Sequence, residues 1–208
     1  EENKCMVFET IHLSLYAVGY NDVSFRDVLN HWAKGNIEFL AAREVIKGKD
    51  AENFDPDGNI TRAEFVTMLV NSINGVTVTG TQSAGFTDVL VGDWFTDYVN
   101  WAVASGIVSG YGDGKFGPND PITREQIALM MDNFIKKSIQ VDLENVQDQS
   151  IFTDEAQINS WAAAAVAEMQ RCGIISGRPD GTFAPQATAT RAEAATIIKG
   201  YIVNRLGL

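Results

Sequence analysis

The sequence predicts a mainly α-helical protein built from three copies of one unit, each copy holding two helices. A five-residue phrase occurs three times, as ITRAE at 60–64, ITREQ at 122–126 and ATRAE at 189–193. The arginine of each phrase follows a tryptophan by 30 residues (62 − 32, 124 − 94 and 191 − 161), whereas the segments that join the copies differ in length. A constant interval inside each copy with variable joints indicates a repeated structural unit.

The first helix of each unit is expected at about 31–43, 94–105 and 161–172. Apolar residues recur after each tryptophan at a spacing that keeps one helix face apolar. They are Ile37 and Leu40, Val99 and Ala102, and Val166 and Met169. Gly106 and Gly173 end this helix in units two and three, because glycine readily adopts the left-handed conformation of a helix C-cap. Unit one has Glu44 there, which should cost about 1 kcal/mol in the same conformation.

The second helix of each unit is expected at about 61–73, 123–138 and 190–205, and it opens on the repeated phrase. A threonine followed three residues later by Glu or Gln is a capping box, in which each side chain bonds a backbone N–H at the helix start. The predicted capping pairs are Thr61 with Glu64, Thr123 with Gln126, and Thr190 with Glu193. The three units therefore span 25–74, 86–138 and 152–205, joined by polar linkers.

Residues 1–24 stand outside the three units. Residues 5–20 are β-branched and aromatic with partial alternation, which is typical of one or two short strands. We expect this extension to be the tail of an upstream β domain or a strand that packs on unit one. The abrupt start at Glu1, without a methionine, leads us to expect a piece of a longer protein.

Composition excludes several classes of function. The 208-residue chain has 27 acidic and 16 basic side chains, a net charge of −11, so it lacks the basic face that a nucleic-acid partner requires. No apolar run reaches the roughly 18 residues of a membrane span. Cys5 and Cys172 lie far apart without a Cys/His cluster, so no zinc or other cofactor is expected, and whether they pair stays open. The sequence holds no nucleophile elbow, phosphate-binding loop or metal motif, so we expect no enzyme activity.

The arginine of the phrase is the residue that capping does not explain. It follows the N-cap directly, where the positive end of the helix dipole disfavours a cation. Free N–H groups, the dipole and a guanidinium could together bind a carboxylate there, or the arginine could form a structural ion pair with a neighbouring unit. The three arginines are Arg62, Arg124 and Arg191. The tryptophans also leave two alternatives, core packing or a platform for a sugar ring; they are Trp32, Trp94 and Trp161.

Residues 53–64 partly match a calcium-binding EF-hand loop. The candidate ligands are Asn53, Asp55, Asp57 and Glu64. Pro56 inside the loop counts against calcium, as does the loss of these ligands from units two and three.

The ordered motifs Phe-x-Asp-Val, Trp-Ala, Gly-Ile-Ile/Val-x-Gly, Asp-Gly-x-Phe-x-Pro and Thr-Arg-Ala-Glu, repeated over about 25–205, resemble the S-layer homology (SLH) family. The resemblance implies three SLH repeats in a compact, all-helical, pseudo-threefold assembly with a central helix bundle and grooves between repeats. It also implies a non-catalytic, extracellular module that anchors a surface protein to the secondary cell wall polymer of a Gram-positive bacterium. The recognised group would be an N-acetylmannosamine that bears a pyruvate ketal.

Carried over by position, the resemblance makes the three arginines and three tryptophans glycan-binding residues, with Gly106 and Gly173 as turns that let the backbone approach the sugar. Unit one lacks both this glycine and the Asp-Gly turn, so its groove is expected to bind weakly. The isolated triplet is expected to be a monomer. The competing hypothesis is a structural self-assembly module in which the arginines form ion pairs between repeats.

Overall fold

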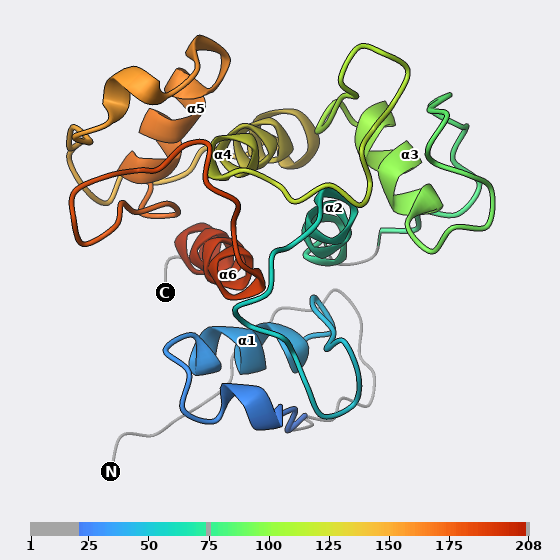
Figure 1. The fold of residues 1–208 in the computed structure, drawn as a ribbon, viewed down its shortest axis with the longest axis horizontal. Helices are drawn as coiled ribbons and strands as arrows, with labels where there is room; N and C mark the ends of the chain where they lie inside the picture. Colours follow the sequence, from blue (N-terminus) through green and yellow to red (C-terminus); the bar gives the residue numbers. More distant parts are fainter. Residues whose placement is uncertain (1–20, 74–75, 207–208) are drawn as a thin grey trace, which may run out of the picture.

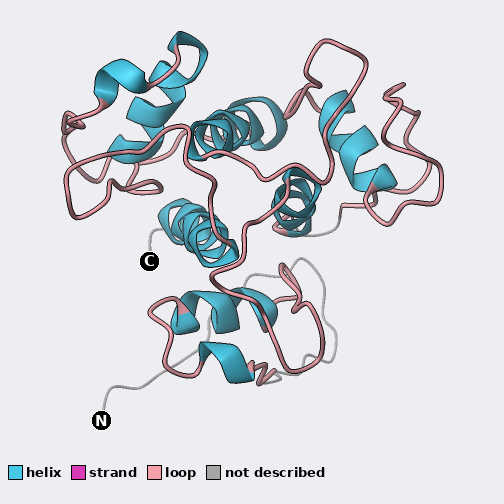
Figure 2. Cartoon of the chain, viewed as in Figure 1, coloured by secondary structure: helices cyan, strands magenta, loops and turns pink. Residues whose placement is uncertain are grey.

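The computed structural model describes residues 21–73 and 76–206. Within these residues the chain is helical, without a β-strand, and its β pairing is limited to three isolated bridges. The predicted all-α fold class is therefore confirmed, whereas the predicted β segment at 5–20 lies outside the described residues. Figure 2 shows the helices and the long loops that join them.

Each repeat contributes an outer and an inner helix. The outer helices are α1 (Lys34–Ala41), α3 (Thr96–Ala104) and α5 (Ser160–Arg171), and the inner helices are α2 (Arg62–Asn71), α4 (Arg124–Asn133) and α6 (Arg191–Leu206). Short 3₁₀ helices, η1 (Arg26–Val28) and η3 (Glu155–Gln157), precede α1 and α5, and a π-helix, η2 (Phe134–Ile139), extends α4. Helices α1 and α3 begin two residues later than their tryptophans, because turns hold Trp32 and Trp94.

The three inner helices lie together at the centre of the molecule, and the outer helices surround them (Figure 1). Each outer helix packs against the inner helix of the preceding repeat: α3 on α2, α5 on α4 and, closing the circle, α1 on α6. Buried apolar side chains from all three repeats form one core. Because its outer helix depends on an inner helix from another repeat, a single repeat has no complete core of its own.

A ring of three backbone hydrogen bonds joins the segments that lead into the inner helices. The N–H of Ile60 donates to the carbonyl of Ala189 (3.1 Å), the N–H of Ala189 donates to Ile122 (3.0 Å), and the N–H of Ile122 donates to Ile60 (3.1 Å). All three side chains are fully buried. The ring therefore satisfies backbone groups that would otherwise be unpaired where the chain crosses the core.

An aspartate in each repeat fixes the loop before the inner helix. In repeat two, the carboxylate of Asp88 accepts hydrogen bonds from the N–H groups of Phe116 and Gly117, both at 2.8 Å. Asp27 and Asp154 do the same in the other repeats. The loop then packs so closely that a Cβ on Gly110 would lie 2.4 Å from the ring of Phe86.

The outer helices end in the predicted left-handed conformation. The φ angle is 70° at Gly106, 67° at Gly173 and 59° at Glu44. Repeat one therefore keeps the turn without the glycine, and its glutamate bears the strain. Cys172, which precedes the turn in repeat three, is buried, and Cys5 lies outside the described residues.

Candidate functional site

The arginine at the start of each inner helix reaches into the next repeat. Arg191 donates from Nε to the carbonyl of Phe54 and from Nη2 to the carbonyl of Lys47, both at 2.9 Å. Its Nη1 forms an ion pair with Oε1 of Glu64 at 3.1 Å. The side chain lies over the Phe54 ring and is only 3% exposed. Arg191 therefore joins repeat three to repeat one.

Arg124 has the same set of contacts with repeat three. Its partners are the carbonyls of Phe183 (2.7 Å) and Ser176 (2.9 Å) and the carboxylate of Glu193 (3.0 Å). Burial lowers the pKa of Arg124, and the charge of Glu193 offsets part of that effect. The ion pairs that the sequence left open as an alternative are thus present for two of the three arginines.

Among the residues that the structure describes, Arg62 has no ion-pair partner. It donates from Nε to the carbonyl of Phe116 (3.0 Å) and from Nη2 to the carbonyl of Ser109 (3.2 Å). Gln126 holds the position that Glu64 and Glu193 hold elsewhere, and within the described residues no carboxylate lies within ion-pairing distance of Arg62. The contact that the arginine of repeat one makes with repeat two therefore differs from the other two contacts, because a glutamine replaces the glutamate.

The backbone N–H groups at the starts of the inner helices are occupied. In α2 the first two donate to carbonyls of the loop before α4, at 3.0 Å each, from Arg62 to Asp120 and from Ala63 to Pro118. Corresponding bonds start α4 and α6. The structure also contains the three capping boxes. The idea that free N–H groups here gather an anion is wrong, because loop carbonyls of another repeat occupy them.

The three repeat tryptophans are exposed. The exposed fraction is 65% for Trp32, 59% for Trp94 and 48% for Trp161. These indoles are too exposed for core packing to explain them. Their exposure favours the other alternative, a platform for a sugar ring.

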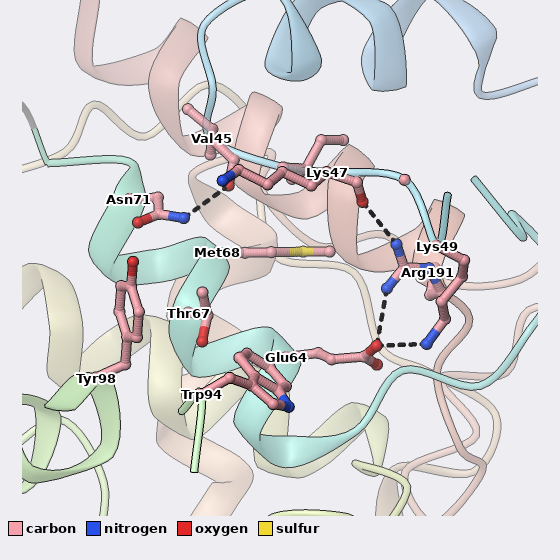
Figure 3. Close-up of a pocket in the computed structure, with 12 residues that line it drawn as sticks. Val45, Lys47, Lys49, Glu64, Thr67, Met68, Asn71, Trp94, Tyr98 and Arg191 are labelled. Atoms are coloured by element: carbon pink, nitrogen blue, oxygen red, sulfur yellow. Dashed lines mark hydrogen bonds and ion pairs between the residues drawn. The ribbon is translucent and has the colours of Figure 1, made fainter. Parts of the chain in front are cut away.

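A groove of about 360 Å³ lies between repeats one and two, and we call it site A (Figure 3). Repeat one provides its loop at 45–49 and one side of α2, repeat two provides Trp94 and Tyr98, and repeat three provides Arg191. The other lining side chains on α2 are Glu64, Thr67, Met68 and Asn71. Residues from all three repeats thus meet in one groove.

Site A is cationic although the chain as a whole is acidic. Three cations, Lys47, Lys49 and Arg191, line it with one anion, Glu64, which gives a local charge of +2 (3 − 1). Oε1 of Glu64 lies 2.5 Å from Nζ of Lys49 and 3.1 Å from Nη1 of Arg191. Burial alone would raise the pKa of Glu64, but the hydrogen bonds from Lys49 and the Thr61 N–H and the charge of Arg191 outweigh it and lower the pKa.

The repeat gives counterparts for the positions of site A: residues 47, 49 and 64 of repeat one correspond to residues 62 further on in repeat two and 129 further on in repeat three. By this correspondence we define site B as the positions Ser109, Tyr111, Gln126, Trp161 and Arg62, and site C as the positions Ser176, Arg178, Glu193, Trp32 and Arg124. A hydrogen bond joins α1 to α6, where Nδ2 of Asn36 donates to Oγ1 of Thr196 at 2.9 Å. Asn36 and Thr196 correspond to Tyr98 and Thr67, which line site A. The three sites are therefore not equivalent.

The glycines expected to approach the sugar do not line site A. A Cβ on Gly106 would lie 3.3 Å from Cδ of Lys137, and one on Gly173 would lie 2.8 Å from the side chain of Val146. Their counterpart Glu44 lines two neighbouring hollows and is not among the residues of site A. The glycine that lines site A is Gly48. That Glu44 weakens the groove of unit one stays a prediction, without support from this geometry.

Sequence reasoning missed Lys49 and Tyr98. Position 49 gives no repeat signal, because its counterparts are Tyr111 and Arg178. Tyr98 could have been found, since it lies four residues after Trp94 and so on the same side of a helical turn.

The structure does not assemble the candidate calcium ligands. Within 21–73 and 76–206, no group of three or more His, Cys, Asp or Glu side chains is placed to hold a metal ion. Glu64 is instead held by Lys49 and Arg191, and the amide of Asn53 donates to Asp50.

Comparison with known proteins identifies the family. The model of the S-layer homology domain matches residues 24–66, 85–128 and 151–195, more than half of the chain. The chain belongs to the S-layer homology family, whose domains anchor surface proteins to the cell wall. It is accordingly a cell-surface, cell-wall protein. None of the described helices is both long and apolar enough to span a membrane.

The relatives are enzymes and S-layer proteins much longer than this chain. Amylopullulanase of Thermoanaerobacterium thermosulfurigenes is 37% identical over 198 residues, which cover 95% of this chain and 10% of that protein. Exoglucanase XynX of Acetivibrio thermocellus is 38% identical over 181 residues, covering 86% and 16%. S-layer protein sap of Bacillus anthracis is 30% identical over 176 residues, covering 84% and 21%. The chain thus spans about a tenth to a fifth of the length of these relatives.

Proposed function

We propose that the chain anchors its parent protein by binding secondary cell wall polymer, and that site A holds a sugar of that polymer bearing a pyruvate ketal. The observation that supports this proposal is that the exposed indole of Trp94 lines one groove between repeats together with three cationic residues, Lys47, Lys49 and Arg191. Site A would thus be the place on this chain where the cell-wall polymer is bound.

The size and lining of site A suit a sugar ring. About 360 Å³ lies at the lower end of the range for small-molecule sites. Trp94 offers a flat apolar face with one polar tip, which suits the mixed surface of a sugar. Thr67 and Asn71, on α2, supply polar groups that can orient the hydroxyl or acetamido groups.

The charge of site A suits a carboxylate. In a chain of net charge −11, a local excess of two cations favours an anion at this place and not over the whole surface. Arg191 is buried and bonded to two carbonyls and to Glu64. Lys49 also pairs with Glu64, but its side chain is 44% exposed, so Lys49 and Lys47 are the cations that would meet the ligand. Arg191 would then position Glu64 and the loop of repeat one.

The ion pairs between repeats do not support the alternative function, a structural self-assembly module. The ion pairs of Arg124 and Arg191 join repeats within one chain, so they carry no argument for association between chains. We therefore propose that the isolated triplet is a monomer in solution.

The test is a pelleting assay with purified cell wall, before and after mild acid removes the ketals. We expect binding to native wall and its loss from ketal-free wall, together with at least tenfold weaker binding by Trp94→Ala and Lys49→Gln. Val91→Ala is the matched control, because Val91 is exposed near Trp94 but does not line site A. Unchanged binding to ketal-free wall would show that the carboxylate is not recognised.

A further inference from the structure

We propose that Asn36 closes site C to the acidic sugar, so that of sites A and C only site A takes it. The inference rests on the proposed function and concerns two groups of residues that the repeat makes equivalent. Site A lies along the contact of α2 with α3, and the corresponding contact at site C is that of α6 with α1. These two helix contacts differ in their hydrogen bonds.

The outer helices of the two contacts can be compared residue by residue, because α1 and α3 both begin two residues after their tryptophan. Asn36 follows Trp32 by four residues, as Tyr98 follows Trp94 (36 − 32 and 98 − 94). Tyr98 lines site A, so Asn36 is its counterpart at site C. An amide, which can both donate and accept a hydrogen bond, thus replaces a phenol.

The side chain of Asn36 is bonded to α6 at both ends. Its Nδ2 donates to Oγ1 of Thr196, and its Oδ1 accepts from Nζ of Lys199, both at 2.9 Å. Oγ1 of Thr196 in turn donates to the carbonyl of Ala192 at 2.9 Å. We call the side chains of Lys199, Asn36 and Thr196 the Asn36 bridge. It ties the outer helix to the inner one through a continuous series of hydrogen bonds.

Site A has the threonine of the Asn36 bridge but not its other two members. Thr67, the counterpart of Thr196, donates to the carbonyl of Ala63 at 2.9 Å. Among the described residues no side chain donates to Oγ1 of Thr67, and Val70 stands where α6 has Lys199. The hydroxyl of Thr67 therefore keeps acceptor capacity for a ligand in the groove of about 360 Å³ that Thr67 and Tyr98 line (Figure 3).

Charge alone would let site C bind an acidic sugar as well. Site C has two cations, Arg124 and Arg178, and one anion, Glu193, which leaves an excess of one cation (2 − 1). Burial lowers the pKa of Arg124, and the nearby charge of Arg178 acts in the same direction. A site of this charge favours an anion, so the Asn36 bridge and not electrostatics would exclude the sugar.

Two variants break the Asn36 bridge in steps. Lys199→Met removes the ammonium and breaks one hydrogen bond, whereas Asn36→Ala removes the amide and breaks both bonds to α6. Lys34→Ala is the matched control on α1, because Lys34 pairs with Glu38 and takes no part in the Asn36 bridge. Thermal unfolding would verify that each variant is folded.

The full chain would be titrated with N-acetylmannosamine bearing a pyruvate ketal, and the indole N–H resonances would be followed by NMR. Trp94 reports on site A and Trp32 on site C. In the native protein we expect the Trp32 midpoint to lie at least about a hundredfold above the Trp94 midpoint. A ligand in site C must break two hydrogen bonds, one of them to a charged group.

Lys199→Met should lower the Trp32 midpoint about tenfold, and Asn36→Ala should bring it to within about tenfold of the Trp94 midpoint. The Trp94 midpoint should stay the same in both, and Lys34→Ala should behave as the native protein. Equal midpoints for Trp94 and Trp32 in the native protein would overturn this inference and leave the proposed function intact. So would a Trp32 resonance that responds in neither folded variant while Trp94 does. If neither tryptophan responds to the acidic sugar in any of these proteins, both proposals are overturned.

Discussion

Arg191 and Glu64 lie 127 residues apart in the chain and form an ion pair of 3.1 Å that joins the last repeat to the first. Glu64 also belongs to the capping box of α2. One carboxylate therefore starts the helix of its own repeat and holds the arginine of another, so helix formation and assembly depend on the same side chain.

Arg191→Ala should lower the free energy of unfolding by about 3–5 kcal/mol, because it breaks a largely buried ion pair and leaves two carbonyls unbonded. Arg62→Ala should cost less, since Arg62 is bonded to two carbonyls but to no carboxylate of the described residues. Urea denaturation followed by circular dichroism compares the two variants. Equal losses would mean that the ion pair contributes nothing beyond the carbonyl contacts.

Acid should weaken the fold through Glu64. Its pKa in the folded protein lies below the usual value of 4.5, so its contribution is complete at neutral pH and is lost as the pH falls through the lowered pKa. Glu64→Gln should therefore be less stable at pH 7 and lose less stability between about pH 5 and pH 3. Denaturant titrations over this pH range measure the effect, and parallel curves for both proteins would argue against it.

Glu44→Gly should raise the free energy of unfolding by about 1 kcal/mol, because glycine adopts a φ of 59° without strain. Glu44→Ala is the matched control and should not stabilise, since alanine keeps a Cβ. Neither change should alter wall binding, because Glu44 does not line site A. Tighter binding by Glu44→Gly would instead support the earlier prediction that this glutamate weakens the groove.

A chain that ends at residue 138 should not fold, because α1 would lose α6, the inner helix on which it packs. Circular dichroism should show little helix, and addition of the separate fragment 139–208 should restore it. Cooperative unfolding of the shortened chain on its own would show that two repeats suffice.

The repeat and its helices could be predicted because they depend on local chemistry. Thr61 and Glu64 predict a helix start because they form a capping box. Gly106 predicts the left-handed turn because glycine adopts a positive φ without strain. The late start of α1 could not be predicted, because a side chain in the preceding turn, His31, accepts the Ala33 N–H through Nδ1.

The candidate site was only partly predictable because it is assembled from different repeats. Arg191 is read correctly as a residue that capping does not explain, but its carbonyl partners at Phe54 and Lys47 are far away in the chain. No local pattern shows that the N–H groups beside it are already bonded. The role of position 126 emerges only when the three arginines are compared in space.

The hydrogen-bond ring of Ile60, Ile122 and Ala189 also sets the number of repeats. Each residue donates to the repeat before it and accepts from the repeat after it, a head-to-tail contact that closes after three steps. Two repeats would leave a donor and an acceptor open in the core, and a fourth would have to break the ring to enter. The hydrogen-bond ring therefore limits one module to three repeats, and longer arrays of such repeats should fold as separate modules of three.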